Sequence, residues 1–588
     1  MEFPLSITAH INSHEGDFSR GIELRSPLTF IVGPNGSGKT HLLKGLKGSF
    51  NALTNKKVRF ISAGRLAPLE QYRSKTDQYS YDIDQAKFGD KYETEQRHQI
   101  ESISGDLHTL YKCPDILIKV QERLRKLFKR DIEIDWDSGY LKVSFSRIGA
   151  SNTYYSSARE ASGLLHLVGI LSALYDDEVG VLLIDEPEVS LHPQLQAFLL
   201  KSQYKSPRLE ELPTFTGGFV GYFACEYIRY IEPTLDFPIL DDDSAMVNDV
   251  DLMLFDKVIA FDHYKNKIYL IANISTNDLE RNYNKAELEL KTLADLVVNG
   301  KEADVPKGIL KTEFTSEFTK DEFEAVVKKT QHYIKEGDIF QCVVSNRREA
   351  EFEGSLLNAY RVLRTLNPSP YMFYLSGGDV ELTGASPETL VKMTDGKMYT
   401  FPIAGTMRRG KNEAEDLAIE EKLINDEKEL AEHNMLVDLG RNDLGKISKF
   451  GSVKVEALHM LQRFSHVIHI TSTVSGDIQD GKDALDAIGA TLPAGTLSGA
   501  PKIRAIEILH ELEKSPRGVY GGAVGYIDFS GNMDVCIGIR MAMNKGGKVY
   551  IRAGAGIVRD SVPASEYNET LIKGQSMISA ITNAQEVE

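Results

Sequence analysis

Two groups of residues in this sequence have the types and spacing that phosphate and metal chemistry require. The first is the run "GPNGSGKT", which fits the pattern G-x-x-x-x-G-K-[ST]. In such a loop backbone N–H groups surround phosphate, the lysine neutralises the β and γ phosphates, and the threonine hydroxyl binds Mg2+. A bland glycine-rich turn is the alternative. The pattern predicts a nucleotide site made by Gly33, Asn35, Gly36, Gly38, Lys39 and Thr40.

An acidic pair farther along the chain belongs to the same chemistry. In "VLLIDEPE" four apolar residues predict a buried strand. This strand would deliver Asp185 to Mg2+ and Glu186 to a position that activates water. Because an acidic pair after a strand is common, the prediction depends on its occurring together with the glycine-rich run.

Four carboxylates form the second group. Glu429 and Glu432 stand three residues apart in one helix-like segment, and Glu566 and Glu569 repeat the spacing in another. Residues three apart share a face of a helix. Together the two pairs would build an octahedral Mg2+ site, with waters and an anionic substrate completing the shell. The alternative is two solvated helix faces.

The segments that carry these groups predict two domains. Residues 1 to about 200 alternate strand, glycine-rich loop, helix and apolar strand, which is typical of an α/β module. From about residue 210, short strands with glycine-rich turns alternate with charged amphipathic helices, which predicts a larger α/β or α+β unit. The polar segment "KSQYKSPRLEELP" between them has linker character. We expect domains at residues 1–203 and 204–588.

Composition excludes several classes of function. The net charge of −17 over 588 residues disfavours broad adhesion to nucleic acid or anionic membranes. The four cysteines lie far apart without a C-x-x-C pair, which argues against a disulfide framework or a zinc site. No leader and no long uncharged apolar segment is evident, so we expect a cytoplasmic protein with no membrane contact.

The first domain resembles the ABC-like P-loop ATPases of the overcoming-lysogenization-defect and RecF type. Their "DEPE.SLHP" element is matched from Asp185 to Pro193. Ser162-Gly163, at an expected helix start, is either their degenerate signature, which contacts the γ phosphate of a second subunit, or a simple helix cap. The sequence pattern changes before the further strands and the switch histidine that these ATPases have. The resemblance therefore implies a truncated module that binds ATP rather than hydrolysing it.

From about Phe215 onward the chain resembles the catalytic part of anthranilate synthase component I, in the chorismate-utilising family. The resemblance implies a chorismate-binding α/β sandwich that uses Mg2+, chorismate and ammonia. The motifs that carry it occur in order, and include "FTGGFVGYF", "NPSPYMFYL", "GASPETLV", "FPIAGTMRRG", "DEKELAEHNMLVDLGRNDLG", "SHVIHITSTVSG", "LPAGTLSGAPKIRA", "RGVYGGAVGYID" and "RAGAGIV".

Carried over by position, the resemblance assigns roles to individual residues. Glu432 and Glu569 would bind Mg2+ directly, with Glu429 and Glu566 reaching it through water. His469 takes the position of the family's catalytic histidine, which assists proton transfer. The residues expected to contact carboxylates of substrate or product are Gly405, Thr406, Thr496, Tyr520, Arg540, Gly556 and Lys573.

Two positions favour ammonia as the nucleophile. Isochorismate and salicylate synthases use a lysine to activate water where this sequence has Gln341, and aminodeoxychorismate synthases typically have a lysine where it has Ala404. The resemblance thus implies attack by ammonia at ring carbon 2 and release of pyruvate, giving anthranilate for tryptophan biosynthesis. The catalytic residues expected are His469, Glu432, Thr406 and Gln341.

The resemblance also implies a partner and leaves alternatives open. No glutaminase-type Cys-His-Glu domain is evident, so ammonia would come from glutamine through a separate amidotransferase subunit in a hetero-oligomer. The family's L-L-E-S element of the tryptophan pocket is not found, which predicts that feedback inhibition is weak or lost. One alternative function is an ABC-type ATP-dependent switch in defence or DNA repair. Another account is a chimera of two incomplete modules.

Overall fold

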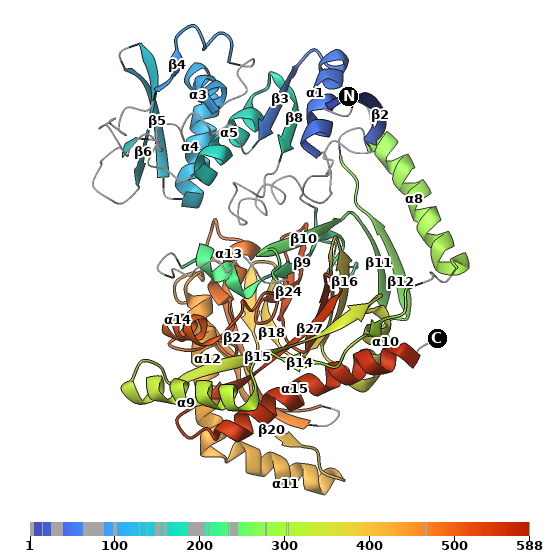
Figure 1. Ribbon diagram of the computed structural model, residues 1–588, viewed down its shortest axis with the longest axis vertical. Helices are drawn as coiled ribbons and strands as arrows, with labels where there is room; N and C mark the ends of the chain where they lie inside the picture. Colours follow the sequence, from blue (N-terminus) through green and yellow to red (C-terminus); the bar gives the residue numbers. More distant parts are fainter. Residues whose placement is uncertain are drawn as a thin grey trace. The chain divides into compact units, whose positions relative to one another are not determined.

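The protein consists of two compact units, Met1–Leu199 and Leu200–Glu588 (Figure 1). The domain boundary expected between residues 203 and 204 stays a prediction, because residues 186–205 lie outside the described part of the chain. The computed structural model describes residues 5–13, 16–24, 39–62, 87–97, 103–128, 130–137, 139–147, 155–156, 162–185, 206–209, 211–232, 235, 245–276, 279–301, 303, 305–464 and 467–586.

The first unit contains a parallel strand pair next to a helix. β3 (Lys57–Ser62) pairs in parallel with β8 (Val179–Asp185), and α1 (Lys39–Leu53) packs on both strands through Leu46 and Phe50. A parallel pair covered by a helix agrees with the expected α/β module. In the same unit, β1 (Leu5–Ser13) pairs antiparallel with β2 (Gly16–Leu24).

A second core of the first unit lies among helices and a small antiparallel sheet. Arg59 of β3 donates hydrogen bonds to the Asp106 carboxylate and, at 3.0 Å, to the Arg97 carbonyl, so a buried ion pair ties β3 to this core. The elements around this second core are β4 (Lys87–Asp90), α3 (Ile103–Lys112), α4 (Pro114–Phe128), β5 (Arg130–Asp137), β6 (Tyr140–Arg147), β7 (Tyr155–Ser156) and α5 (Ser162–Tyr175).

Two large antiparallel sheets form the second unit. The first has the order β10-β9-β24-β25-β18-β19-β22-β20, with β21 also on β22. All its pairs are antiparallel, so the α+β alternative describes this unit. Its strands are β9 (Gly218–Phe223), β10 (Val250–Phe255), β18 (Thr389–Thr394), β19 (Lys397–Thr400), β20 (Ile403–Arg408), β21 (Lys454–Arg463), β22 (Val467–Asp477), β24 (Ala523–Asp528) and β25 (Met533–Ile537).

The second sheet has the order β13-β15-β27-β26-β17-β16, with β14 and β23 also on β15. Tyr222 of the first sheet and Leu382, Met541 and Tyr550 of the second share one buried apolar cluster, so the two sheets pack face to face. The strands are β13 (Ile309–Leu310), β14 (Thr315–Ser316), β15 (Gln341–Glu353), β16 (Tyr371–Gly377), β17 (Val380–Ser386), β23 (Gly499–Ala500), β26 (Met541–Lys545) and β27 (Lys548–Ile557).

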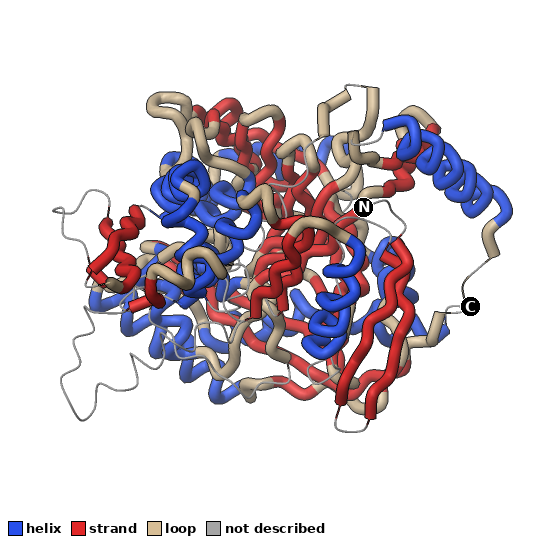
Figure 2. Tube along the Cα trace, turned by 90° about the horizontal axis from the view of Figure 1, so that it is seen from above, coloured by secondary structure: helices blue, strands red, loops and turns tan. Residues whose placement is uncertain are grey.

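Helices cover the second sheet on the face away from the first. α15 packs along β27 through Met577 and Ala580, and α9 packs on β15 through Phe323 and Val327. Figure 2 separates strands from helices by colour. The helices on this sheet are α9 (Lys320–Glu336), α10 (Leu357–Leu366), α14 (Lys502–Leu512) and α15 (Pro563–Asn583), whereas α11 (Glu413–Ile424), α12 (Glu427–Gly445) and α13 (Ala484–Thr491) pack on the first sheet.

The remaining elements are the hairpin of β11 (Lys257–Asp262) and β12 (Lys267–Ala272), the helix α8 (Leu279–Asn299), and the short helices η5 (Cys225–Tyr230) and η6 (Ala584–Glu586). The two segments predicted to carry the acidic pairs are confirmed as helices, α12 and α15. Among the described helices, none has the length and apolarity needed to span a bilayer.

Replacing the cap of α9 is expected to loosen this helix. The Thr319 hydroxyl accepts from the Glu322 N–H, and the Glu322 carboxylate accepts from the Thr319 N–H at 2.8 Å. Thr319→Ala should therefore cost about 1 kcal/mol, and Thr319→Ser should cost little. Hydrogen exchange of the α9 amides checks this. Equal exchange rates in the wild-type protein and Thr319→Ala would contradict it.

Candidate active site

A bulge in β20 brings three predicted site residues together. β20 pairs with β22 so that Thr406 lies opposite His469, and the register shifts between Ala404 and Thr406. The extra residue, Gly405, has a φ of +68°, which glycine adopts without strain. The His469 Nδ1 atom lies 3.1 Å from the Gly405 carbonyl and 3.0 Å from the Thr406 hydroxyl. The structure thus brings these three residues together, and their roles in a site stay predictions.

This arrangement fixes the tautomer of His469. A carbonyl oxygen only accepts, so Nδ1 carries the hydrogen and Nε2 of the neutral ring presents its lone pair. Burial lowers the pKa of His469, and the edge of the Phe464 ring packs at a centroid distance of 5.3 Å. His469 is therefore suited to accept a proton at Nε2.

The first acidic pair lies beside the bulge. The Asp426 carboxylate caps α12 by accepting from the N–H groups of Lys428 and Glu429 at 3.1 and 3.2 Å. The Glu429 Oε2 atom is 3.3 Å from the position that a Cβ atom on Gly405 would occupy. Burial, and then repulsion by Glu432, raises the pKa of Glu429. A cation placed between these two carboxylates would relieve that repulsion.

The second acidic pair lies at the start of α15. Burial, followed by the charge of Glu569, raises the pKa of Glu566, while Lys428 of α12 is near enough to lower it. The Glu569 carboxylate has a counter-charge, because the Lys573 Nζ atom lies 2.5 Å from its Oε1 atom. The first turns of α12 and α15 are thus close enough for their charges to interact.

The two pairs are not gathered into one ligand cluster. In the described part of the chain, no group of three or more His, Cys, Asp or Glu side chains is arranged to hold a metal ion. The predicted site of four carboxylates stays a prediction. Its donor chemistry fits Mg2+, which prefers carboxylate oxygens and retains several waters.

A second group of predicted residues surrounds the end of β27. The Arg540 Nη1 atom donates to the Lys573 carbonyl at 2.7 Å, and the Lys573 Nζ atom donates to the Gly554 carbonyl at 3.0 Å. A Cβ atom on Gly554 would lie 2.7 Å from the Tyr520 hydroxyl, and one on Gly556 would lie 3.2 Å from the amide nitrogen of Gln341. These contacts place Tyr520, Arg540, Gly556, Lys573 and Gln341 around one strand end.

The side chains of this group suit a carboxylate. Burial raises the pKa of Tyr520 to about 12, so its phenol remains a hydrogen-bond donor. Arg540 and Lys573 supply positive charge, and a guanidinium can donate two parallel hydrogen bonds. Arg540 has a φ of +51°, a strained conformation for a residue with a side chain. Strain of this kind is concentrated at binding sites.

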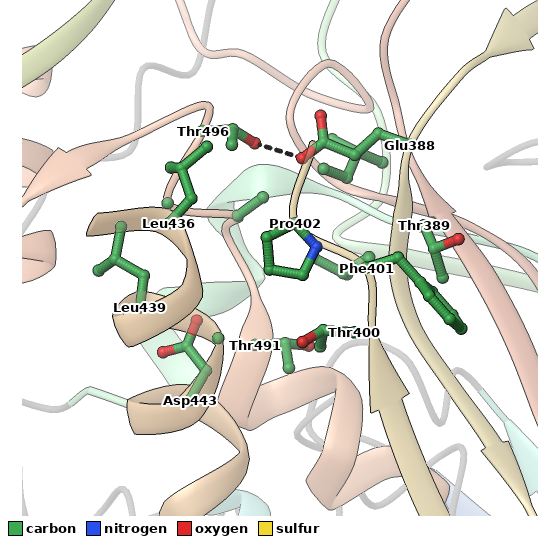
Figure 3. Close-up of a pocket in the computed structure, with 15 residues that line it drawn as sticks. Glu388, Thr389, Thr400, Phe401, Pro402, Leu436, Leu439, Asp443, Thr491 and Thr496 are labelled. Atoms are coloured by element: carbon green, nitrogen blue, oxygen red, sulfur yellow. Dashed lines mark hydrogen bonds between the residues drawn. The ribbon is translucent and has the colours of Figure 1, made fainter. Parts of the chain in front are cut away.

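Sequence analysis missed one acid, Glu388. The Thr496 hydroxyl donates to its Oε1 atom at 3.0 Å (Figure 3). Burial raises the pKa of Glu388 to about 7, although the Thr496 hydrogen bond and the charge of Lys573 oppose this effect. A carboxyl group with this pKa can donate a proton near neutral pH. The available signal was its place in the motif "GASPETLV", at the start of a strand.

Glu388 and Thr496 open onto a pocket between α12, α13 and β19. Its empty volume is about 440 Å³, including space open to solvent. The Thr400 hydroxyl in its wall is buried and has no hydrogen-bond partner within the described residues. His469 and Arg540 do not line it. Other residues of its wall, drawn in Figure 3, are Leu436, Leu439, Asp443 and Thr491.

The nucleotide site is described only at its edges. Lys39 and Thr40 begin α1, and Asp185 ends β8 opposite Ser62 of β3. The side chains of Lys39, Thr40 and Asp185 lie outside the described part of the structure. α5 begins at Ser162. The helix predicted after the glycine-rich loop is confirmed, and so is the strand predicted before Glu186. Nucleotide binding stays a prediction. The predicted residues that lie outside the described chain are Gly33, Asn35, Gly36, Gly38 and Glu186.

Models of known families match both parts of the chain. The model of the chorismate binding enzyme family matches residues 153–579, more than half of the chain. The chain belongs to the chorismate-binding enzyme family. A second model, described as an AAA domain, matches residues 9–202. The resemblances stated for both parts of the sequence are therefore confirmed.

Two relatives of this chorismate-binding enzyme share a name. "Anthranilate synthase component 1" of Acetivibrio thermocellus is 45% identical over 396 residues, which cover 66% of this chain and 80% of the relative. The protein of that name from Aquifex aeolicus (strain VF5) is 46% identical over 387 residues, 64% of this chain and 76% of the relative.

A solved structure supports the fold. Anthranilate synthase component I from Streptococcus pneumoniae TIGR4 superposes with a TM-score of 0.58 at 39% identity, covering 65% of this chain and 85% of that chain. The chorismate-binding fold is therefore established for the second unit.

The bulge is expected to be essential for chorismate turnover. Gly405→Ala would strain a left-handed backbone and place Cβ 3.1 Å from Ile470 Cδ1 as well as 3.3 Å from Glu429 Oε2. We expect a loss of about 1 to 2 kcal/mol of stability and a fall on the order of 100-fold in kcat/KM.

Gly451→Ala is the matched control, because Gly451 has a φ of +76° and open space around it. It should lose similar stability from backbone strain and retain full turnover. Equal turnover in the two variants would show that the bulge does not position the site.

Proposed function

We propose that this chorismate-binding enzyme is the large subunit of anthranilate synthase. It would act as a lyase in tryptophan biosynthesis, converting chorismate and ammonia to anthranilate and pyruvate. The observation that carries the proposal is the position of His469, held by Gly405 and Thr406 beside the Glu429 carboxylate. The shared name of relatives at 45% and 46% identity supports it.

Binding of substrate would use the two groups of residues in different ways. Arg540, Tyr520 and Lys573 would bind carboxylate by charge and hydrogen bonds, and Thr496, Thr406 and the backbone at Gly405 and Gly556 would complete the contacts. Mg2+ would be held directly by Glu432 and Glu569, with Glu429 and Glu566 reaching it through water. When bound, it would hold the ring carboxylate and draw electron density from the ring.

Proton transfer would use Glu388 and His469. The protonated Glu388 carboxyl would donate to the 4-hydroxyl, which leaves as water while ammonia adds at ring carbon 2. The ammonium group formed at carbon 2 gives up one proton, which restores the protonated form of Glu388. Loss of the carbon 2 proton then breaks the bond between carbon 3 and the enolpyruvyl oxygen and makes the ring aromatic, and the leaving enolpyruvate takes up a proton at its methylene carbon to become pyruvate. The neutral Nε2 atom of His469 is suited to accept that carbon-bound proton. Gln341 is an amide and cannot act as a base on water, which favours ammonia.

The proposal includes a partner and an added module. Ammonia would be supplied from glutamine by a separate amidotransferase subunit in a hetero-oligomer. The first domain, which we place at residues 1–203, would bind ATP through Lys39, Thr40, Asp185 and Glu186. The AAA-domain match over residues 9–202 supports nucleotide binding. It also favours the second candidate function, an ATP-dependent switch with the synthase part as its sensor.

The decisive experiment measures anthranilate fluorescence with chorismate, Mg2+ and ammonium. The full chain should form anthranilate, and EDTA should abolish it. Glu432→Gln should lower kcat/KM on the order of 100-fold or more, because one charged ligand of the cation is lost. Glu427→Gln is the control, since Glu427 is exposed in the first turn of the same helix. Full activity in Glu432→Gln would refute the metal assignment.

A substitution in the ATP module distinguishes the anthranilate synthase from the ATP-dependent switch. Lys39→Ala should weaken ATP binding and leave anthranilate formation unchanged if the synthase is the main activity. ATP turnover that depends on Lys39, together with no anthranilate from the wild-type chain, would favour the switch.

The pH dependence of the reaction should report on Glu388. Its protonated form is the active one, so kcat/KM at constant free ammonia should fall as pH rises through about 7. The Thr496 hydrogen bond stabilises the charged form, so Thr496→Val should raise the pKa of Glu388 and move this fall to higher pH. Thr496→Ser, which keeps the hydroxyl, should behave as the wild type. A fall at unchanged or lower pH in Thr496→Val would rule out this role.

A further inference from the structure

One buried guanidinium connects the segments that carry several candidate site residues. The Arg517 side chain is 6% exposed. Its Nη1 atom donates to the Leu497 carbonyl at 2.5 Å, and its Nη2 atom donates to the Val343 carbonyl at 2.7 Å. Leu497 follows Thr496 directly, and Val343 stands two residues after Gln341 on β15. Arg517 therefore fixes the backbone next to two candidate residues from different parts of the fold.

The same residue also contacts Tyr520. The guanidinium carbon lies 5.9 Å from the centre of the Tyr520 ring, and the Tyr520 N–H donates to the Arg517 carbonyl at 3.2 Å. The Tyr520 hydroxyl stands over Gly554, where a Cβ atom would approach it to 2.7 Å. A displacement of Arg517 would therefore move the Tyr520 hydroxyl at the end of β27.

A carboxylate holds the guanidinium in one plane. The Arg517 Nε and Nη2 atoms donate to the two oxygens of Glu513 at 2.8 and 2.7 Å. Burial alone would raise the pKa of Glu513, but the charge and hydrogen bonds of Arg517 hold it below its usual range. Glu513 also accepts from the Ser345 N–H and hydroxyl, both at 2.8 Å. Paired hydrogen bonds of this kind fix geometry as well as charge.

A second buried carboxylate fixes the backbone of the same residue. Glu226 of η5 accepts from the Arg517 N–H at 2.6 Å and from the Gly518 N–H at 3.0 Å. The Gly518 carbonyl accepts in turn from the Cys225 N–H at 2.8 Å. Both the main chain and the side chain of Arg517 are thereby held by hydrogen bonds to buried acidic side chains.

We propose that Arg517 is a positioning residue of the chorismate site, which sets the Thr496 and Tyr520 hydroxyls relative to each other. The inference rests on the proposed function. Arg517 reaches a carboxylate and two carbonyls at once because a guanidinium carries five N–H donors in a fixed fork. A lysine ammonium presents a single point from which these three acceptors cannot all be reached.

Arg517→Lys in the full chain tests the inference. It should lower kcat on the order of 100-fold, as expected for a displacement of about 1 Å in a catalytic group. It should also move the alkaline fall of kcat/KM to higher pH, because Thr496 would lose its hydrogen bond to Glu388. A residue that only stabilised the core would leave the pH profile of the folded enzyme unchanged.

Glu226→Gln provides a milder second variant. The substitution keeps the shape of the side chain but turns the NH2 group of the amide toward the N–H of Arg517 or Gly518. The guanidinium of Arg517 stays in place. We expect kcat to fall about 3- to 10-fold, with a pH shift in the same direction. If Arg517→Lys does not fold, this variant decides the inference.

Glu381→Gln is the matched control. Glu381 is a buried carboxylate that accepts from the Leu356 N–H at 2.8 Å and from the Ser355 hydroxyl at 2.6 Å, away from the candidate residues. It should lower the melting temperature about as much as Glu226→Gln and leave kcat, KM and the pH profile unchanged.

The outcomes separate the inference from the function on which it rests. A wild-type chain that forms no anthranilate defeats the proposed function. A wild-type chain that is active, with folded Arg517→Lys or Glu226→Gln variants that retain its kcat and pH profile, overturns the positioning role alone.

Discussion

The pairing of β15 with β27 is the constraint on which the candidate site depends. The ladder runs from Cys342 opposite Ile557 to Glu351 opposite Lys548. Because side chains alternate between the two faces of a strand, Ile557 packs among the helices while Gly556 faces the other way, toward Gln341. A register shift of one residue would exchange these faces and bury the candidate site under α9 and α15. The open space beside Gln341 therefore depends on the register of β15 and β27 as well as on the missing side chain of Gly556.

Charge imposes a second constraint on the same region. Acidic side chains gather at the first turns of α12 and α15, and mutual repulsion contributes to the raised pKa of Glu429 and Glu566. Helix N-termini favour negative charge, which offsets part of this cost. Lys573 supplies a counter-charge to Glu569, and its charge also opposes the rise that burial causes in the pKa of Glu388. One lysine therefore connects the acidic pairs electrostatically with the proposed proton donor.

The sequence predicts local features well and distant contacts poorly. Spacing of acids at three residues identifies α12 and α15, because helix periodicity is a local property. The resemblance names His469 and Thr406, whose contact spans 63 residues. Neither source identifies Arg517, because its partners come from separate segments and its importance lies in backbone carbonyls that any residue possesses. Spacing alone also does not pair the two acidic segments with each other, since α12 and α15 lie far apart in sequence.

The conformation of Arg540 has a consequence for the evolution of this enzyme. Its φ of +51° is one that glycine would adopt at lower free energy. Selection for stability alone would thus favour glycine at this position, by about 1 kcal/mol. Such a change would remove the guanidinium that lies beside Tyr520 and Lys573. With the carboxylate-binding role proposed for Arg540, position 540 is one where conformational stability and substrate affinity oppose each other.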